Sequence, residues 1–233
     1  MLQHGGLDRY DNEDLINAKF ECVFSVNIES GERGNRVMLN LEKIKIDYCK
    51  NQLREGYTRT YSDMEKHMGN IVVWTAHLAL EHIANSDALY HNVEHTVLVA
   101  LAGQSILEGK HLAEGGVSPS DWAHFMIALL CHDIGYVRGI CRADKDPVLA
   151  TGVGGATVEI EPGSTDAVLA PYHIDRSKLF IQERFGEGML ENGVIDSQQI
   201  CDYIEMTRFP PPDDPNYQDT SGYKGLVRAA DFI

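Results

Sequence analysis

Apolar residues recur at helical spacing from about residue 62 onward. Residues 71–83 are apolar around most of the circumference of a helix, which predicts a buried helix. The next periodic segment predicts a helix over residues 92–107, with Gly109 ending it. These two segments indicate a fold that is built from packed helices.

The third predicted helix has a strong start signal. Ser118 can cap it, Pro119 suits its first position and Asp121 suits its first turn. The helix continues through an apolar run and stops near Gly135. The later helical segments are a stretch that opens at Thr165 or Asp166, residues 176–185, a helix capped by Asp196 that runs to Met206, and a helix from near Ser221 to the last residue.

Two segments between these helices are predicted to be loops. Residues 151–164 are rich in glycine, and residues 209–217 contain prolines that exclude a helix interior. The predicted fold class is therefore mainly all-α, with one domain over residues 56–233. The last predicted helix reaches the final residue, as expected if the domain is truncated there.

The N-terminal segment, residues 1–55, is predicted less specifically. Residues 20–28 are rich in β-formers, and residues 37–46 alternate in part between apolar and polar positions. A small strand pair around the GERGN turn at residues 31–35 fits this pattern, and a helix over the second stretch is the alternative. The segment could form a separate element, a capping layer or a dimerisation arm, and the last role is compatible with a homodimer.

Composition and charge narrow the classes of partner. Hydrophobic residues make up 43% of the 233 residues, enough for a substantial core. The formal net charge of −15 argues against a nucleic-acid polymer or an anionic membrane surface. A small phosphorylated substrate stays open, because a bound metal ion can supply local positive charge.

The cysteines and the apolar runs indicate a cytoplasmic protein. The five cysteines include no CxxC pair, which is more typical of a reducing cytosol than of a disulfide scaffold. The N-terminus lacks a basic-then-apolar signal. The longest apolar runs are far shorter than the roughly 20 residues of a membrane helix.

Three stretches place imidazoles and carboxylates beside apolar helices. YHNVEH at residues 90–95 carries His91 and His95, IALLCHDIG at residues 127–135 carries His132 and Asp133, and GLVRAADFI at residues 225–233 carries Asp231. A buried carboxylate is costly alone, and a metal ion beside neutral imidazoles removes that cost. This nitrogen and oxygen set suits Fe, Mn, Zn, Mg, Ni or Co.

The three stretches, in this order, resemble the His…His-Asp…Asp signature of the HD-domain metal-dependent phosphohydrolase superfamily. YHNVEH also resembles the Tyr-His-Asn-x-x-His motif of cyclic-nucleotide phosphodiesterase catalytic domains. The resemblance covers about residues 90–233 and implies an HD-domain/phosphodiesterase-like helical bundle with one or two divalent metal ions. The metal ligands that it implies are His95, His132, Asp133 and Asp231.

The resemblance also implies catalytic roles. Asp133 would bridge two ions, and His91 would protonate the leaving oxygen. His173 lies where relatives with cyclic-dinucleotide phosphodiesterase activity carry a further ligand, so it could bind a second metal or the substrate. Among nearby basic residues, Arg138 follows the ligand pair most closely and is the favoured phosphate contact. The loop at residues 151–164 could act as a lid.

The chain departs from the phosphodiesterase pattern in two places. HDIGYVRG stands where those enzymes carry His-Pro-Gly, and IEMTRFP at residues 204–210 lacks the His-His-Glu of the cyclic-dinucleotide enzymes. These differences leave the substrate open.

Structural roles are the alternative for each candidate. His91 and His95 could cap a helix, and His132 with Asp133 could form a buried hydrogen-bonded pair. Asp231 could lie at a frayed end, and His173 could be a loop residue.

The leading functional hypothesis is a metal-dependent phosphohydrolase that cleaves a phosphomonoester or phosphodiester bond of a small nucleotide-like substrate. The alternatives are an HD-type di-iron oxygenase, in which His173 and His91 serve the second iron, and a non-catalytic metal-binding regulatory module. His91 at its phosphodiesterase-like spacing favours hydrolysis.

Overall fold

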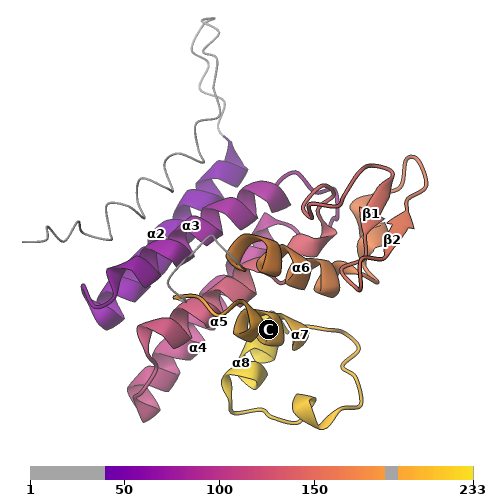
Figure 1. Ribbon diagram of the computed structural model, residues 1–233. Coiled ribbons are helices and arrows are strands. Elements are labelled where there is room, and N and C mark those ends of the chain that lie inside the picture. Colours follow the sequence, from indigo (N-terminus) through magenta and orange to yellow (C-terminus); the bar gives the residue numbers. More distant parts are fainter. Residues whose placement is uncertain (1–39, 187–193, 233) are drawn as a thin grey trace, which may run out of the picture. The chain divides into compact units, whose positions relative to one another are not determined.

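The computed structural model describes residues 40–186 and 194–232. Their fold is mainly helical, as the sequence predicts, with one two-stranded sheet among the described residues. The principal helices are α2 (Leu41–Tyr61), α3 (Lys66–Ile83), α4 (Val93–Glu114), α5 (Pro119–Cys131), α6 (His173–Phe185), α7 (Ser197–Glu205) and α8 (Tyr223–Asp231) (Figure 1). Short 3-10 turns are η1 (Ile134–Tyr136), η2 (Asp166–Leu169) and η3 (Pro215–Tyr217).

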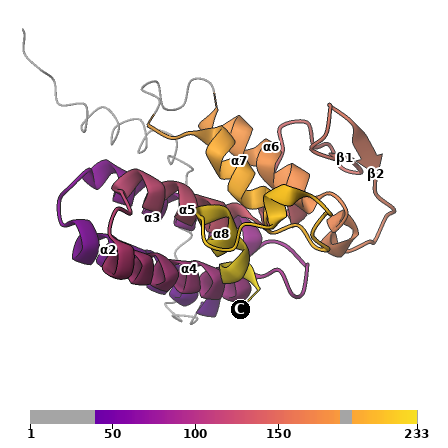
Figure 2. The same cartoon turned by 90° about the horizontal axis from the view of Figure 1, so that it is seen from below.

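Helix α5 is the centre of the helical unit. It packs against α3, α4, α7 and α8, and almost every one of its side chains is buried. The predicted start is confirmed, because Ser118 and Asp121 form a reciprocal capping box with Pro119 in the first turn. Figure 2 shows α8 beside α4 and α5, so the last helix closes over the end of the central one.

Helix α2 extends the bundle toward the N-terminus and packs on α3 and α4. The strand expected over residues 37–46 is wrong for the described part, because residues 41–46 open this helix; the helical alternative is confirmed there. Asn40 caps it by accepting a hydrogen bond from the Lys43 backbone, and buried residues such as Ile46 and Leu53 then recur at helical spacing. The strand expected over residues 20–28 lies outside the described residues.

The compact unit that contains the described residues begins at Asn40. Helix α2 therefore runs across residue 55, where the sequence analysis placed the domain boundary. The described helices include none that is both long and apolar enough to cross a membrane.

Two other boundaries differ from the sequence prediction. Helix α4 continues through Gly109, which lies on an open face where an added Cβ would contact no other atom. The helix is ended instead by its C-cap residue Gly115, whose φ of 70° suits glycine. The small β element overlaps the stretch expected to be a loop, residues 151–164: β1 (Val148–Ala150) ends just before it and pairs antiparallel with β2 (Thr157–Glu159) inside it.

Arg176 joins this hairpin and its preceding loop to α6. The side chain is fully buried, and all its N–H groups have acceptors. The guanidinium pairs with both oxygens of Asp144 at 2.9–3.0 Å and donates to the carbonyls of Gly135, Val137 and Ala150. A bidentate pair with three further hydrogen bonds offsets the cost of burying the charge.

We predict that Arg176→Gln destabilises the protein by about 3–5 kcal/mol, because Asp144 would stay buried without its partner. Arg54→Gln is the matched control, since Arg54 is exposed and, among the described residues, bonds only to Asn51. It should change stability by less than about 0.5 kcal/mol. Urea unfolding of both variants measures the difference. Equal, small effects would show that the Arg176 network is not needed for stability.

Candidate metal centre

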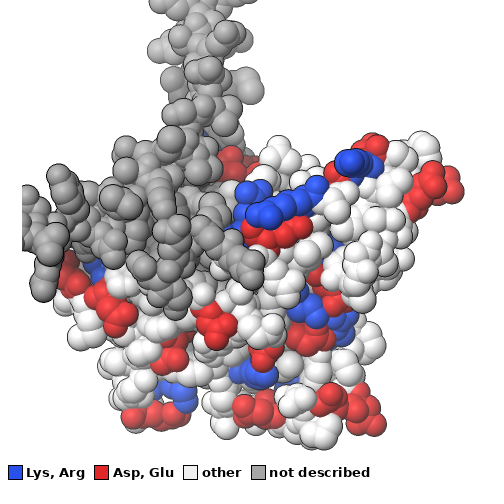
Figure 3. Space-filling view, viewed as in Figure 1, with Lys and Arg blue, Asp and Glu red and all other residues white. Residues whose placement is uncertain are grey.

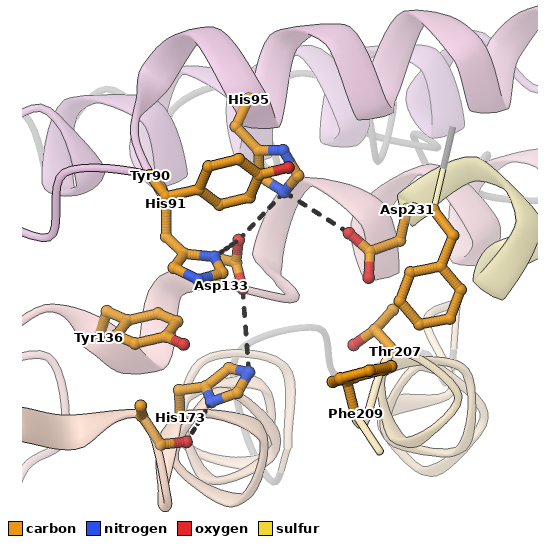
Figure 4. A pocket seen from close by; sticks show the side chains of 11 residues that line it. Tyr90, His91, His95, Asp133, Tyr136, His173, Thr207, Phe209 and Asp231 are labelled. Carbon is orange, nitrogen blue, oxygen red and sulfur yellow. Dashed lines mark hydrogen bonds and ion pairs between the residues drawn. The ribbon is translucent and has the colours of Figure 1, made fainter. Parts of the chain in front are cut away.

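Five histidine and aspartate side chains from four helical segments line one pocket (Figure 4), and a sixth, His132, lies behind them against Asp133 and Asp231. We call them the His/Asp cluster. His91 lies in the turn before α4 and His95 in its first turn. His132 and Asp133 directly follow α5, His173 opens α6, and Asp231 ends α8. All the candidate ligands that the sequence indicates are thus brought together.

Local sequence places each of these side chains. Asn92 caps α4 by accepting from the His95 backbone N–H at 3.1 Å, which puts the two α4 histidines on either side of the cap. Gly135 lets α6 approach closely, because a Cβ there would lie 1.9 Å from the His173 carbonyl oxygen. Ser177 donates to the His132 carbonyl at 2.7 Å and accepts from the Gly135 N–H at 2.9 Å.

The imidazoles and carboxylates of the four predicted metal ligands lie at ligand-like distances from one another. His132 Nε2 lies 3.1 Å from Asp133 Oδ2 and 3.1 Å from Asp231 Oδ1. His95 Nε2 lies 3.3 Å and 3.5 Å from the same two oxygens. Ligand atoms that each sit about 2.0–2.2 Å from a shared ion lie roughly 3.0–3.5 Å from one another. Two overlapping sets, His95–His132–Asp231 and His91–His95–Asp133, have ligand atoms that all lie within 4.8 Å of one another, so each set could hold a divalent cation.

The orientation of His132 supports this assignment. Its Nδ1 donates to the Leu129 carbonyl at 2.7 Å, which leaves Nε2 facing the carboxylates. Nε2 is buried and makes no hydrogen bond of good geometry within the described part of the chain. Bare imidazole nitrogen and carboxylate oxygens repel one another at this distance unless a proton or a cation lies between them, so the residues fit a metal ion.

His91 and His173 extend the set on the other side of Asp133. His91 Nδ1 lies 2.7 Å from Asp133 Oδ2, and His173 Nε2 lies 4.0 Å from Asp133 Oδ1. His173 Nδ1 donates to the Ala170 carbonyl at 2.6 Å, as His132 does to Leu129. Burial lowers the pKa of His173, which keeps its imidazole neutral and available as a ligand.

The pKa values show how strongly the cluster attracts positive charge. Hydrogen bonds to Asp133 and Asp231 raise the pKa of His95 to about 9. Burial opposes a charge on His132, yet the same carboxylates raise its pKa well above the usual range. Burial likewise opposes a charge on Asp231, but His132 and His95 hold its pKa at about 2. The positive charge can be carried by protons or by a cation that replaces them.

The cluster forms one wall of a pocket of about 450 Å³. Aromatic side chains form much of the rest: Tyr136 lies beside the histidines, and the exposed rings of Tyr90, Phe209 and Phe232 stand at the rim. The pocket lining contains no lysine or arginine among the described residues. Sequence reasoning missed these aromatics, although Tyr90 and Tyr136 adjoin the motifs that it used.

The structure does not bring Arg138 to the pocket. Its Nε lies 2.8 Å from Asp166 Oδ1, and its Nη2 donates to the Ser164 carbonyl, so the guanidinium binds the start of η2 and the loop before it. The expectation of a phosphate contact from Arg138 gains no support from this arrangement. Residues 151–164, expected as a lid, likewise contribute nothing to the lining of the pocket.

The sequence matches the Npun_R2479-like family over residues 39–233. The chain belongs to this family. The whole His/Asp cluster lies inside the matched segment. Neither the curated proteins nor the solved structures include a match to the chain. The function of this Npun_R2479-like protein is therefore inferred from the geometry of its own residues.

We predict that the protein binds divalent metal and that His132→Ala removes it, because this substitution takes away the buried nitrogen at the centre of the ligand set. Metal content after reconstitution with Mn, Fe or Ni, measured by plasma mass spectrometry, should fall at least about tenfold. His67→Ala, on α3 outside the cluster, should retain it. Wild-type protein without metal after reconstitution would exclude a metal centre.

We predict that the stability of the metal-free protein falls as pH rises. In metal-free protein the pKa of His95 is raised to about 9, so its stabilisation is complete below its unfolded pKa of about 6.5 and is lost as pH rises through 9. A bound cation takes the place of these protons. Metal-free protein should therefore lose about 1–2 kcal/mol between pH 6.5 and 9, after allowance for partial exposure. The metal-loaded protein should keep its stability over the same pH range.

Tm values for the two forms at pH 6.5 and 9 measure the effect. The gap in Tm between metal-loaded and metal-free protein should widen as pH rises. A gap that stays constant would contradict the replacement of protons by metal.

Proposed function

We propose that this protein is an HD-type, metal-dependent phosphohydrolase that acts on a small phosphate ester. The observation that carries the proposal is the buried His132 Nε2 facing two carboxylate oxygens at 3.1 Å, with His95 completing the set. His95, His132, Asp133 and Asp231 would hold the ion. A divalent ion bound there would lower the pKa of water and neutralise phosphoryl oxygens.

His91 is the proposed proton donor to the leaving oxygen. Its Nδ1 is held by Asp133 Oδ2 at 2.7 Å, which orients the ring and leaves Nε2 to carry the transferred proton. The ring also stacks on Tyr136, with centroids 4.2 Å apart and planes 17° from parallel. A histidine fixed on two sides in this way is suited to deliver a proton at one place.

The charges in the pocket favour a phosphodiester over a phosphomonoester. The lining contains Asp133 and Asp231 but, among the described residues, no basic side chain other than histidine. A monoester carries close to two negative charges near neutral pH and a diester carries one, so the diester leaves less charge uncompensated in a pocket whose described lining has no lysine or arginine. The aromatic rim would suit a flat organic group on that diester, such as a nucleobase.

The charge of the protein surface outside the pocket supports a small substrate. On the face drawn in Figure 3, lysine and arginine side chains lie beside aspartate and glutamate side chains. Together with the net charge of −15, this mixture is unlike the positive surface that a nucleic-acid polymer requires. The described cysteines, Cys49, Cys131, Cys141 and Cys201, are all unpaired and buried, which supports a cytoplasmic location.

A di-iron oxygenase is the second candidate function. The observation that favours it is the pair of extra imidazoles next to Asp133, since His91 and His173 could hold a second ion. The absence of lysine and arginine from the described pocket lining would also suit an uncharged substrate. Two irons per chain, visible absorbance and O₂ uptake would identify this chemistry, and hydrolysis with Mn, Mg or Ni would identify the other.

We predict that metal-loaded protein hydrolyses bis(p-nitrophenyl) phosphate with a kcat/KM about tenfold or more above that for p-nitrophenyl phosphate, because of the second negative charge on the monoester. His91→Gln should lower kcat by about 10²–10⁴-fold while stoichiometric metal is retained. Asp133→Asn should abolish both activity and full metal occupancy. Preference for the monoester, or full activity in His91→Gln, would contradict the proposed substrate or the proposed proton donor respectively.

A further inference from the structure

Tyr136 is held between two imidazoles of the His/Asp cluster. Its ring stacks on His91 at a centroid distance of 4.2 Å and on His173 at 4.4 Å, with interplanar angles of 17° and 19°. The side chain is 5% exposed and belongs to the pocket lining. The two stacking partners leave the phenol ring a single orientation, in which its hydroxyl points into the pocket (Figure 4).

The hydroxyl of Tyr136 lacks a hydrogen-bond partner among the described residues. Other buried tyrosines are paired: the Tyr57 hydroxyl donates to the carbonyls of Met64 and Glu65 at 2.6 and 2.8 Å, and Tyr61 donates to Val117 at 2.9 Å. Thr207, which also lines the pocket, already donates to the Ile204 carbonyl. Because the Tyr136 hydroxyl opens onto the pocket and bonds no described residue, it can form a hydrogen bond with a group that enters the pocket.

We propose that the Tyr136 hydroxyl donates a hydrogen bond to a non-bridging phosphoryl oxygen of the bound substrate. The inference rests on the proposed phosphohydrolase function and adds a substrate-contacting residue to it. A neutral donor suits this pocket, where the described lining offers an anion no lysine or arginine. Its fixed direction means that little reorganisation is needed when charge develops on the oxygen.

The surroundings of the hydroxyl keep it in the donor form. Burial raises the pKa of Tyr136 above its ordinary value. The phenol therefore retains its proton across the physiological range. A phenolate could not donate and would repel a phosphate.

The test is Tyr136→Phe in metal-reconstituted protein, because phenylalanine keeps both stacking contacts and removes only the hydroxyl. Metal content should be unchanged and Tm should stay within about 2 °C of wild type, since the hydroxyl supports no described group. The affinity for inorganic phosphate, measured by calorimetry, should fall about tenfold. The kcat/KM for bis(p-nitrophenyl) phosphate should fall about 10²-fold.

Tyr57→Phe is the matched control, because its hydroxyl is paired with backbone carbonyls far from the cluster in sequence. It should lower Tm by about 3 °C or more and leave the phosphate affinity unchanged. If Tyr136→Phe instead lowers Tm as Tyr57→Phe does and binds phosphate as wild type does, the hydroxyl is structural and the proposal fails.

Phosphate binding also separates this inference from the proposed function. Wild type that binds phosphate through Tyr136 without hydrolysing any ester would support the donor role and overturn the hydrolase. Metal-loaded wild type that does not bind phosphate would overturn the donor role. Hydrolysis that is unaffected in Tyr136→Phe would also overturn it while leaving the hydrolase intact.

Discussion

Asp133 places a buried carboxylate where three imidazoles meet, and the neutralisation of this group is the constraint on which the rest of the site depends. Its Oδ2 lies 2.7 Å from His91, 3.1 Å from His132 and 3.3 Å from His95. Burial opposes the charge of Asp133, yet these imidazoles hold its pKa well below the usual range. The charge survives in the core only because positive charge surrounds it, and a divalent ion supplies that charge more compactly than protons do.

The fold meets this constraint by closing three elements around the end of one helix. Helix α5 carries His132 and Asp133 into the core, while α4 and α8 contribute His95 and Asp231 beside them. On the far side, α6 approaches so closely that residue 135 can only be glycine. The buried Arg176 holds that approach by donating to the Gly135 carbonyl at 2.7 Å. The candidate metal centre and the packing of α6 are therefore parts of one arrangement.

The pocket combines a strongly charged floor with a neutral, aromatic wall. Asp133 and Asp231 would be neutralised by the ion, and the remaining lining is mostly aromatic or histidine. In the proposed function, such a lining would direct an ester by its phosphate toward the metal and by its organic group toward the rim. The stacked rings of His91, Tyr136 and His173 make the wall rigid, because each ring restricts the rotation of its neighbour.

The sequence by itself determined the helical class, the capped starts of α5 and α7 and the residues that meet in the cluster. These features depend on signals within a few residues: a cap, an apolar run, or a histidine and carboxylate at a helix end. The tertiary structure alone decided the roles of Tyr136, Arg176 and Arg138. Their partners are distant in sequence, as when Arg176 reaches Asp144 and Tyr136 stacks on His173, and local spacing carries no information about which distant groups will meet.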